Sequence, residues 1–99
     1  AYKTVMMKPQ DNVAVALSSI PKGAVIQVRC QNQSITVKLL SDIEFGHKFA
    51  VASIPAGSDV IKYGEVIGEA VRDIAVGEHV HIHNVEGKRG RGDRIGHAN

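Results

Sequence analysis

The sequence predicts a small all-β domain with short strands, tight Gly/Pro turns and little helix. Ten glycines in 99 residues, together with many Val and Ile residues, favour turns and strands over helices. Aromatic residues make up only 4% of the chain and Trp is absent, so the core must be built from Val, Ile, Ala and Leu. A chain of this length forms one domain with a core, but it does not also enclose a large cleft.

A short turn pattern recurs four times and is the clearest organising feature of the chain. Each copy consists of Ser or Asp, then Ile, two further residues and Gly; the copies are 19–23, 42–46, 53–57 and 73–77. We interpret the Ile as a buried anchor that enters a tight turn, with Gly at the fourth position of that turn. Two copies carry Pro after the Ile, where a type I or II turn favours it. The apolar residues expected to pack after the four turns are Val25, Phe49, Val60 and Val80.

The segments between these corners are predicted as strands in chain order. They are residues 2–7, 12–17, 25–30, 34–40 and 66–70. In the fourth of them apolar and polar residues alternate, which is typical of a half-buried strand. Residues 62–65 predict a second kind of turn, directly before the strand predicted over 66–70. Helix is limited to a turn or two near 11–17, where Asp11 could act as a cap.

The segment 77–84 carries three of the five histidines of the chain. In a strand, the alternation would place His79, His81 and His83 on one face and Val80 and Ile82 on the other, packed inward. Imidazole suits proton transfer and metal binding, so we predict His81 and His83 as catalytic residues and all three as candidate metal ligands. A solvated strand face without a function is the alternative.

Strand geometry limits what these histidines can do alone. At a rise of about 3.3 Å per residue, His79 and His83 would lie roughly 13 Å apart, too far to share one ion. A neighbouring pair could share an ion, with further ligands from elsewhere. His47, at the second corner, would supply a missing ligand if that corner folds next to the histidines; a surface turn histidine is the alternative.

Four further residues are candidates for substrate binding, together with His47. Lys48 and Lys62 could pair with a carboxylate as point charges, although a solvated surface lysine is the simpler interpretation of either one alone. Tyr63 suits packing with a wet hydroxyl or a catalytic role. Asn84 could hydrogen-bond a sugar hydroxyl or turn the chain.

The distribution of charge argues against a nucleic-acid binder. The net charge is +2, and its excess lies entirely in the last 14 residues, which carry four Lys/Arg and two Asp/Glu. No basic face with stacking aromatics is evident before them.

The same C-terminal segment is rich in Gly and charged residues, so we predict a domain over 1–86 and a flexible Gly/Arg-rich tail over 87–99. The single Cys30, with no secretory signal and no long apolar run, predicts a cytoplasmic protein with no membrane partner.

Several motifs in a fixed order carry a family resemblance. They are Asp-Asn-Val-Ala-Val-Ala at 11–16, Gly-His-Lys-Phe-Ala at 46–50, Ile-Pro-Ala-Gly at 54–57, Lys-Tyr-Gly at 62–64, Ile-Gly at 67–68, Asp-Ile at 73–74 and Gly-Glu-His-Val-His-Ile-His-Asn at 77–84. Over about residues 5–92 the chain resembles the small N-terminal SAF-type domain of the altronate and galactarate dehydratases. The resemblance covers the small domain and does not extend to the large catalytic domain that follows it in the fused enzymes. Some relatives encode the two parts separately, including sulfolactate sulfo-lyase.

The resemblance implies a β-clip fold and a small, non-autonomous subunit of a sugar-acid dehydratase. That enzyme would be a carbon–oxygen lyase giving a 2-keto-3-deoxy acid, with a large catalytic subunit as partner. It also implies a divalent metal, Fe²⁺ or Mn²⁺, held mainly with the large subunit; a homo-oligomer remains open. The alternatives are the small subunit of a sulfolactate-type sulfo-lyase and a stand-alone SAF-type carbohydrate-binding module. A large dehydratase-like subunit encoded next to the chain would favour the first two.

Overall fold

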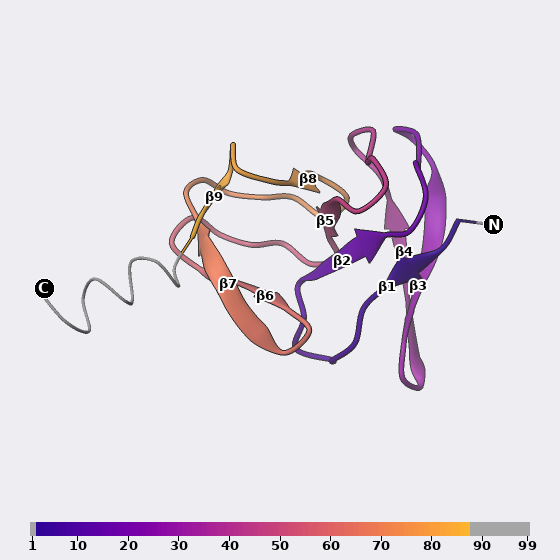
Figure 1. Ribbon diagram of the computed structural model, residues 1–99, viewed down its shortest axis with the longest axis horizontal. Coiled ribbons are helices and arrows are strands. Elements are labelled where there is room, and N and C mark those ends of the chain that lie inside the picture. The colour runs from indigo at the N-terminus through magenta and orange to yellow at the C-terminus, as the bar shows by residue number, and fades with distance from the viewer. Residues whose placement is uncertain (1, 88–99) are drawn as a thin grey trace, which may run out of the picture.

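The computed structural model describes residues 2–87, which form nine short strands and no helix (Figure 1). The strands are β1 (Thr4–Val5), β2 (Val13–Ala16), β3 (Val25–Cys30), β4 (Gln33–Lys38), β5 (Lys48–Ala50), β6 (Asp59–Lys62), β7 (Glu65–Ala70), β8 (His79–Val80) and β9 (Val85–Glu86). The all-β prediction is confirmed. The predicted tail lies outside the described residues except for Gly87. Within the described part, no helix is long and apolar enough to cross a membrane.

The strands pair antiparallel in three small sheets. The central sheet has the order β1-β2-β5-β8, while β3-β4 form a hairpin and β6-β7-β9 a third sheet. In Figure 1 the central sheet lies between the β3–β4 hairpin and the β6–β7 hairpin. All four residues of β2 are buried because the sheet has a core on each face. Ala14 and Phe49 pack into one apolar cluster, whereas Val13 and Ala50 pack into the other.

The four repeated corners pair with one another in twos. The backbones of Ile20 and Ile43 exchange two hydrogen bonds of 2.8 and 2.9 Å, and those of Ile54 and Ile74 do the same. All four side chains are buried, which confirms their role as anchors. Each pairing joins corners at least 20 positions apart in the chain, so it closes a loop, and the entropic cost of closing a loop grows only slowly with its length.

The corner glycine has a different place in its turn from the one predicted. In the first corner the carbonyl of Pro21 accepts a hydrogen bond from the N–H of Ala24, so Gly23 is the third residue of the turn. Its φ is +91°, the left-handed conformation that a type II turn requires at this position. Of the apolar residues expected to pack after the corners, three are buried. Val25 is exposed because Ile26 takes the inward position on β3.

Asp11 does not cap a helix but ties two loops together. Its side chain is buried; Oδ2 accepts hydrogen bonds from the N–H groups of Met7 and Lys8, and Oδ1 accepts one of 2.7 Å from Gly64. Burial by itself raises the pKa of this carboxyl. The backbone hydrogen bonds, led by that from Gly64, stabilise the carboxylate more strongly, so the pKa of Asp11 falls below its usual range.

A lowered pKa in the folded state makes Asp11 a source of pH-dependent stability. That stability is fully present above the unfolded pKa of about 3.9 and is lost as pH falls through the lower folded value. We expect Asp11→Asn to reduce the free energy of unfolding at pH 7 by about 2 kcal/mol, because it weakens the charge-assisted bonds from three backbone N–H groups to the buried carboxylate. Urea denaturation at pH 7 and at pH 3 measures the difference.

The difference in the free energy of unfolding between wild type and Asp11→Asn should be smaller at pH 3 than at pH 7. Asp42→Asn is the control, since Asp42 is exposed and accepts a single backbone bond, from Lys22. A difference for Asp11→Asn that is independent of pH would contradict the assignment of the stability to the charge.

Candidate functional site

The histidine segment is a short strand followed by a tight turn, so the prediction of one continuous strand is wrong. Strand β8 ends at Val80, and Asn84 then fixes the turn: its Oδ1 accepts a hydrogen bond from the N–H of His81, and its Nδ2 donates to the carbonyl of His79, both at 2.9 Å. As a consequence Ile82 is 84% exposed instead of packed inward, whereas Val80 is fully buried as expected.

The fold brings His47 to His79 and His81, and we call these three residues the histidine cluster. Strands β5 and β8 pair Lys48 with Val80 and Phe49 with His79, and the same register continued by one residue places His47 opposite His81. The rings are stacked, with centroids 4.7 to 5.4 Å apart and interplanar angles of 14° to 18°. His47 Nδ1 lies 2.9 Å from His79 Nε2.

The histidine cluster fits a divalent transition metal. One ring nitrogen from each residue can be chosen such that all three lie within 4.8 Å of one another. Two nitrogens that each lie about 2.0–2.1 Å from one ion are roughly 3 Å apart, close to the His47–His79 separation. Imidazole suits several divalent transition metals. Glu44 Oε1 lies 3.6 Å from His47 Nε2, where a carboxylate would orient the ring.

The electrostatics of the cluster also suit a ligand role for His79. Partial burial lowers the pKa of His79, and the neighbouring charges of His47, His83, His81 and Lys48 lower it further. Both effects disfavour the imidazolium and favour the neutral ring, which keeps a lone pair for a metal.

His83 stands apart from the cluster. Its ring centroid is 5.4 Å from that of His79, the rings are tilted by 32°, and it contributes no nitrogen to the three-residue group. Its backbone carbonyl accepts a hydrogen bond of 3.1 Å from Arg72 Nη2. The ligand set suggested by the structure therefore contains His47 where the sequence suggested His83.

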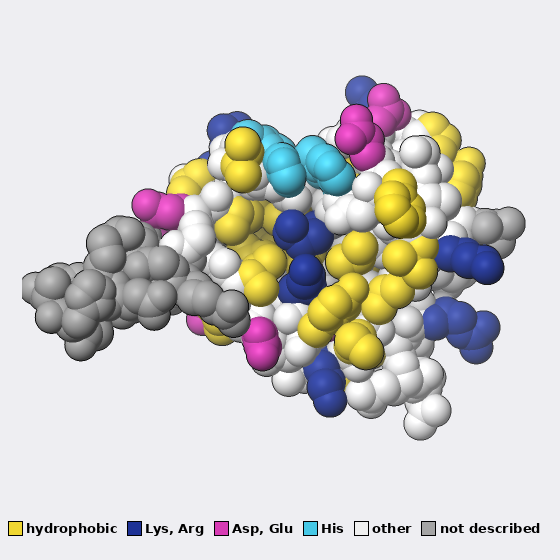
Figure 2. Space-filling view, in the orientation of Figure 1, with side chains coloured by type: hydrophobic (Ala, Val, Ile, Leu, Met, Phe, Trp, Pro, Cys, Tyr) yellow, Lys and Arg dark blue, Asp and Glu magenta, His cyan; other side chains and the backbone are white. Residues whose placement is uncertain are grey.

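Lys48 lies at the same site. With His81 it lines a hollow of about 230 Å³, whose other lining residues are Ile67, Ile82, Val85 and Gly87. Burial lowers the pKa of Lys48, and the positive charge of Lys62 lowers it further. Figure 2 shows Lys and Arg side chains in an apolar surface next to the histidines. An anionic group bound here would therefore be attracted by two ammonium groups.

Lys62 links Tyr63 to this surface. Its Nζ lies 5.1 Å from the centre of the Tyr63 ring, a cation–π contact. Tyr63 has a φ of +56°, which is unusual for a bulky residue and is held in the β6–β7 turn by the Asp11–Gly64 bond. Asn84 is buried with both amide atoms bonded inside its own turn, so its placement fits the turning role.

Comparison with known proteins places the chain in a family. Residues 2–88 match the model of the altronate/galactarate dehydratase SAF domain. The chain belongs to this family. The SAF domain described here is 50% identical over 74 residues to the altronate dehydratase of Escherichia coli K12, a match that covers 75% of this chain and 14% of that enzyme.

Two further relatives differ in how much of their own length the SAF domain covers. The altronate dehydratase of Bacillus subtilis 168 is 39% identical over 82 residues, which are 83% of this chain and 16% of the enzyme. The (2R)-sulfolactate sulfo-lyase subunit alpha of Paracoccus pantotrophus is 45% identical over 62 residues, which are 63% of this chain and 92% of that subunit. The SAF domain thus spans a small part of the dehydratases and nearly all of the sulfo-lyase subunit.

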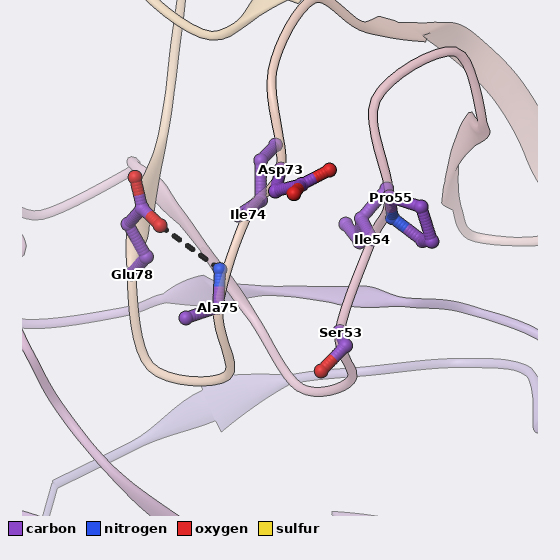
Figure 3. Close-up of a pocket in the computed structure, with 7 residues that line it drawn as sticks. All are labelled: Ser53, Ile54, Pro55, Asp73, Ile74, Ala75 and Glu78. Atoms are coloured by element: carbon purple, nitrogen blue, oxygen red, sulfur yellow. Dashed lines mark hydrogen bonds between the residues drawn. The ribbon is translucent and has the colours of Figure 1, made fainter.

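A hollow larger than the one beside the histidine cluster lies elsewhere in the SAF domain, and nothing in the sequence predicted it. It has a volume of about 400 Å³ and lies where the Ile54 and Ile74 corners meet (Figure 3). Both carboxylates that line it already accept hydrogen bonds from backbone. Asp73 accepts one from the N–H of Ala56, and Glu78 accepts one from the N–H of Ala75. A similar hollow of about 330 Å³ lies at the other corner pair. Both therefore follow from the repeated corner geometry.

Proposed function

We propose that this SAF domain is the small, non-autonomous part of a sugar-acid dehydratase. In this proposal it helps to hold metal or substrate beside a large catalytic subunit, and the whole enzyme is a carbon–oxygen lyase that forms a 2-keto-3-deoxy acid. The observation that carries the proposal is the histidine cluster with Lys48 beside it. The altronate dehydratases among its relatives support the reaction class.

The reaction removes a weakly acidic proton beside a carboxylate and expels a neighbouring hydroxyl. Fe²⁺ or Mn²⁺, when held by His47, His79 and His81, would stabilise negative charge that develops on the substrate carboxylate. Lys48 supplies a positive charge for the same carboxylate, and Lys62 adds a second. His83, which lies outside the ligand group, is free to accept or donate a proton.

Most of the acid–base machinery must then come from the large subunit. At this site the histidine cluster offers metal ligands, and Glu44 offers a carboxylate next to His47. Glu44 is largely exposed, so it is poorly placed to act as a buried acid or base. Tyr63 contacts Lys62 through a cation–π interaction. A surface this open does not exclude water, which a dehydratase site needs to do.

We expect the chain to be inactive alone and active with its partner. The purified chain is incubated with Fe²⁺ and with altronate or galactarate, with and without the dehydratase-like large subunit encoded in the same genome. Formation of 2-keto-3-deoxy acid is measured. Product should form only when both parts are present; turnover by the chain alone would contradict the proposal.

A sulfo-lyase is the second candidate, because this chain matches nearly the full length of a sulfo-lyase subunit. The same reconstitution with sulfolactate distinguishes the two: loss of the sulfonate group, with no reaction of sugar acids, would favour the sulfo-lyase. Binding of a neutral sugar by the chain without any partner would instead favour a stand-alone carbohydrate-binding module.

A further inference from the structure

Ile82 is the most exposed large hydrophobic residue among residues 2–87. Its side chain is 84% exposed, and the next, Phe45, is 69% exposed. Single exposed aliphatic residues are common on protein surfaces and by themselves indicate nothing. The surroundings of Ile82, however, set it apart.

The turn that presents Ile82 is held rigidly. Asn84 bonds the backbone of His79 and His81 through its side chain, and the N–H groups of Asn84 and Val85 both donate to the carbonyl of His81. Arg72 holds the carbonyl of His83 from outside the turn. Because the backbone of this turn is already held in place, binding through Ile82 would not have to order the loop, which lowers the entropic cost of an interface.

Ile82 also lies at the rim of the candidate site. It lines the 230 Å³ hollow together with His81, Lys48 and the aliphatic side chains of Ile67 and Val85. Anything that covers Ile82 would therefore also cover one side of the histidine cluster, which is only half-buried in the chain as it stands.

The charge around Ile82 indicates which partner fits. Arg72 contacts the turn itself, and Lys48 lines the adjoining hollow, so this apolar surface is bordered by cations. A complementary surface would offer an apolar pocket bordered by carboxylates. The C-terminal residues 88–99 are a poor match, because they carry four Lys/Arg and one Asp. A second copy of the chain would bring the same cations together.

We propose that the 81–84 turn docks on the large catalytic subunit, with Ile82 inserted into an apolar pocket and Arg72 paired with a carboxylate of that subunit. This inference rests on the proposed function, since it requires that a large subunit exists. Docking would close the open side of the histidine cluster and leave Lys48 facing the enclosed space, available to substrate.

The test measures the dissociation constant between this chain and the large subunit encoded in the same genome. We expect Ile82→Asp to weaken binding about 100-fold or more and Ile82→Ala about tenfold, as for a buried anchor residue. Val25→Asp is the matched control: Val25 is 63% exposed on β3, in the hairpin on the other side of the central sheet (Figure 1), and its replacement should change binding less than about threefold. Thermal unfolding confirms that each variant folds.

The possible outcomes separate this inference from the proposed function. If wild type binds and Ile82→Asp binds equally well, the docking proposal is wrong while the two-part enzyme stands. An unchanged dissociation constant with a raised KM for the sugar acid would mean that Ile82 faces substrate, which also overturns docking. Self-association of the chain that Ile82→Asp abolishes would identify a second copy as the occupant and overturn it as well. If wild type does not bind the large subunit, both proposals fall.

Discussion

Replacement of His79 and His81 by Gln is expected to reduce the activity of the reconstituted two-part enzyme by about 10²-fold or more, the scale of losing acid–base or ligand imidazoles. Gln keeps polarity and approximate size, and both rings are partly exposed, so the variant should fold normally. Activity is measured with saturating Fe²⁺, and bound metal is counted by elemental analysis of the purified complex.

His83→Gln is the matched control for metal binding. His83 belongs to the same turn but lies outside the three-residue ligand group, so its replacement should leave the metal content unchanged. Metal loss in the His79/His81 variant together with metal retention in His83→Gln would support the cluster of His47, His79 and His81. Full activity of the double variant would refute the site assignment.

Gly77→Ala is expected to be the most destabilising small substitution in the fold. Gly77 has a φ of +88°, and a methyl group there would overlap the backbone carbonyl oxygen of Lys38. Backbone cannot move aside as a flexible side chain can, so we expect a loss of about 4 kcal/mol or more in the free energy of unfolding. The expected result is a chain that is largely unfolded at 25 °C or that has a strongly lowered midpoint in urea.

Gly57→Ala isolates the steric part of this effect. Gly57 occupies the corresponding place in another corner, with a φ of +86°, but an added methyl group would have no neighbour within 4 Å. Its substitution should incur only the left-handed backbone penalty, roughly 1–2 kcal/mol. Equal destabilisation by the two substitutions would show that backbone conformation, and not the close approach to Lys38, governs both positions.

The local features of the fold could be predicted from sequence. Gly and Pro dictate turns over four or five residues, so the four corners and the all-β class were evident from composition and pattern. The pairing of Ile20 with Ile43 and of Ile54 with Ile74 was not, because it depends on which distant segments meet. The expectation that Asp11 caps a helix was wrong, because residues 13–16 form a strand and the Asp11 carboxylate binds N–H groups of two loops instead.

The candidate site shows the same division. The alternation of histidines with Val80 and Ile82 favoured a continuous strand. An alternating pattern does not reveal that the Asn84 side chain accepts a hydrogen bond from the N–H of His81, in the turn that follows the end of the strand at Val80. Asn84 was the available signal, since Asn is common in turns. The approach of His47 was foreseen only as a possibility, because it depends on the β5–β8 pairing.

The histidine cluster unites segments that are remote in the chain, since His47 and His79 are 32 positions apart in the sequence. No fragment containing only one of these segments can form it, so the three-histidine site exists only in the folded chain. By thermodynamic linkage, any metal that binds there stabilises the whole domain by RT ln(1 + [L]/Kd), where [L] is the free metal concentration. A shift of the melting curve with added metal would therefore report occupancy of the cluster without any assay of catalysis, and the resistance of the domain to unfolding would follow the supply of metal around it.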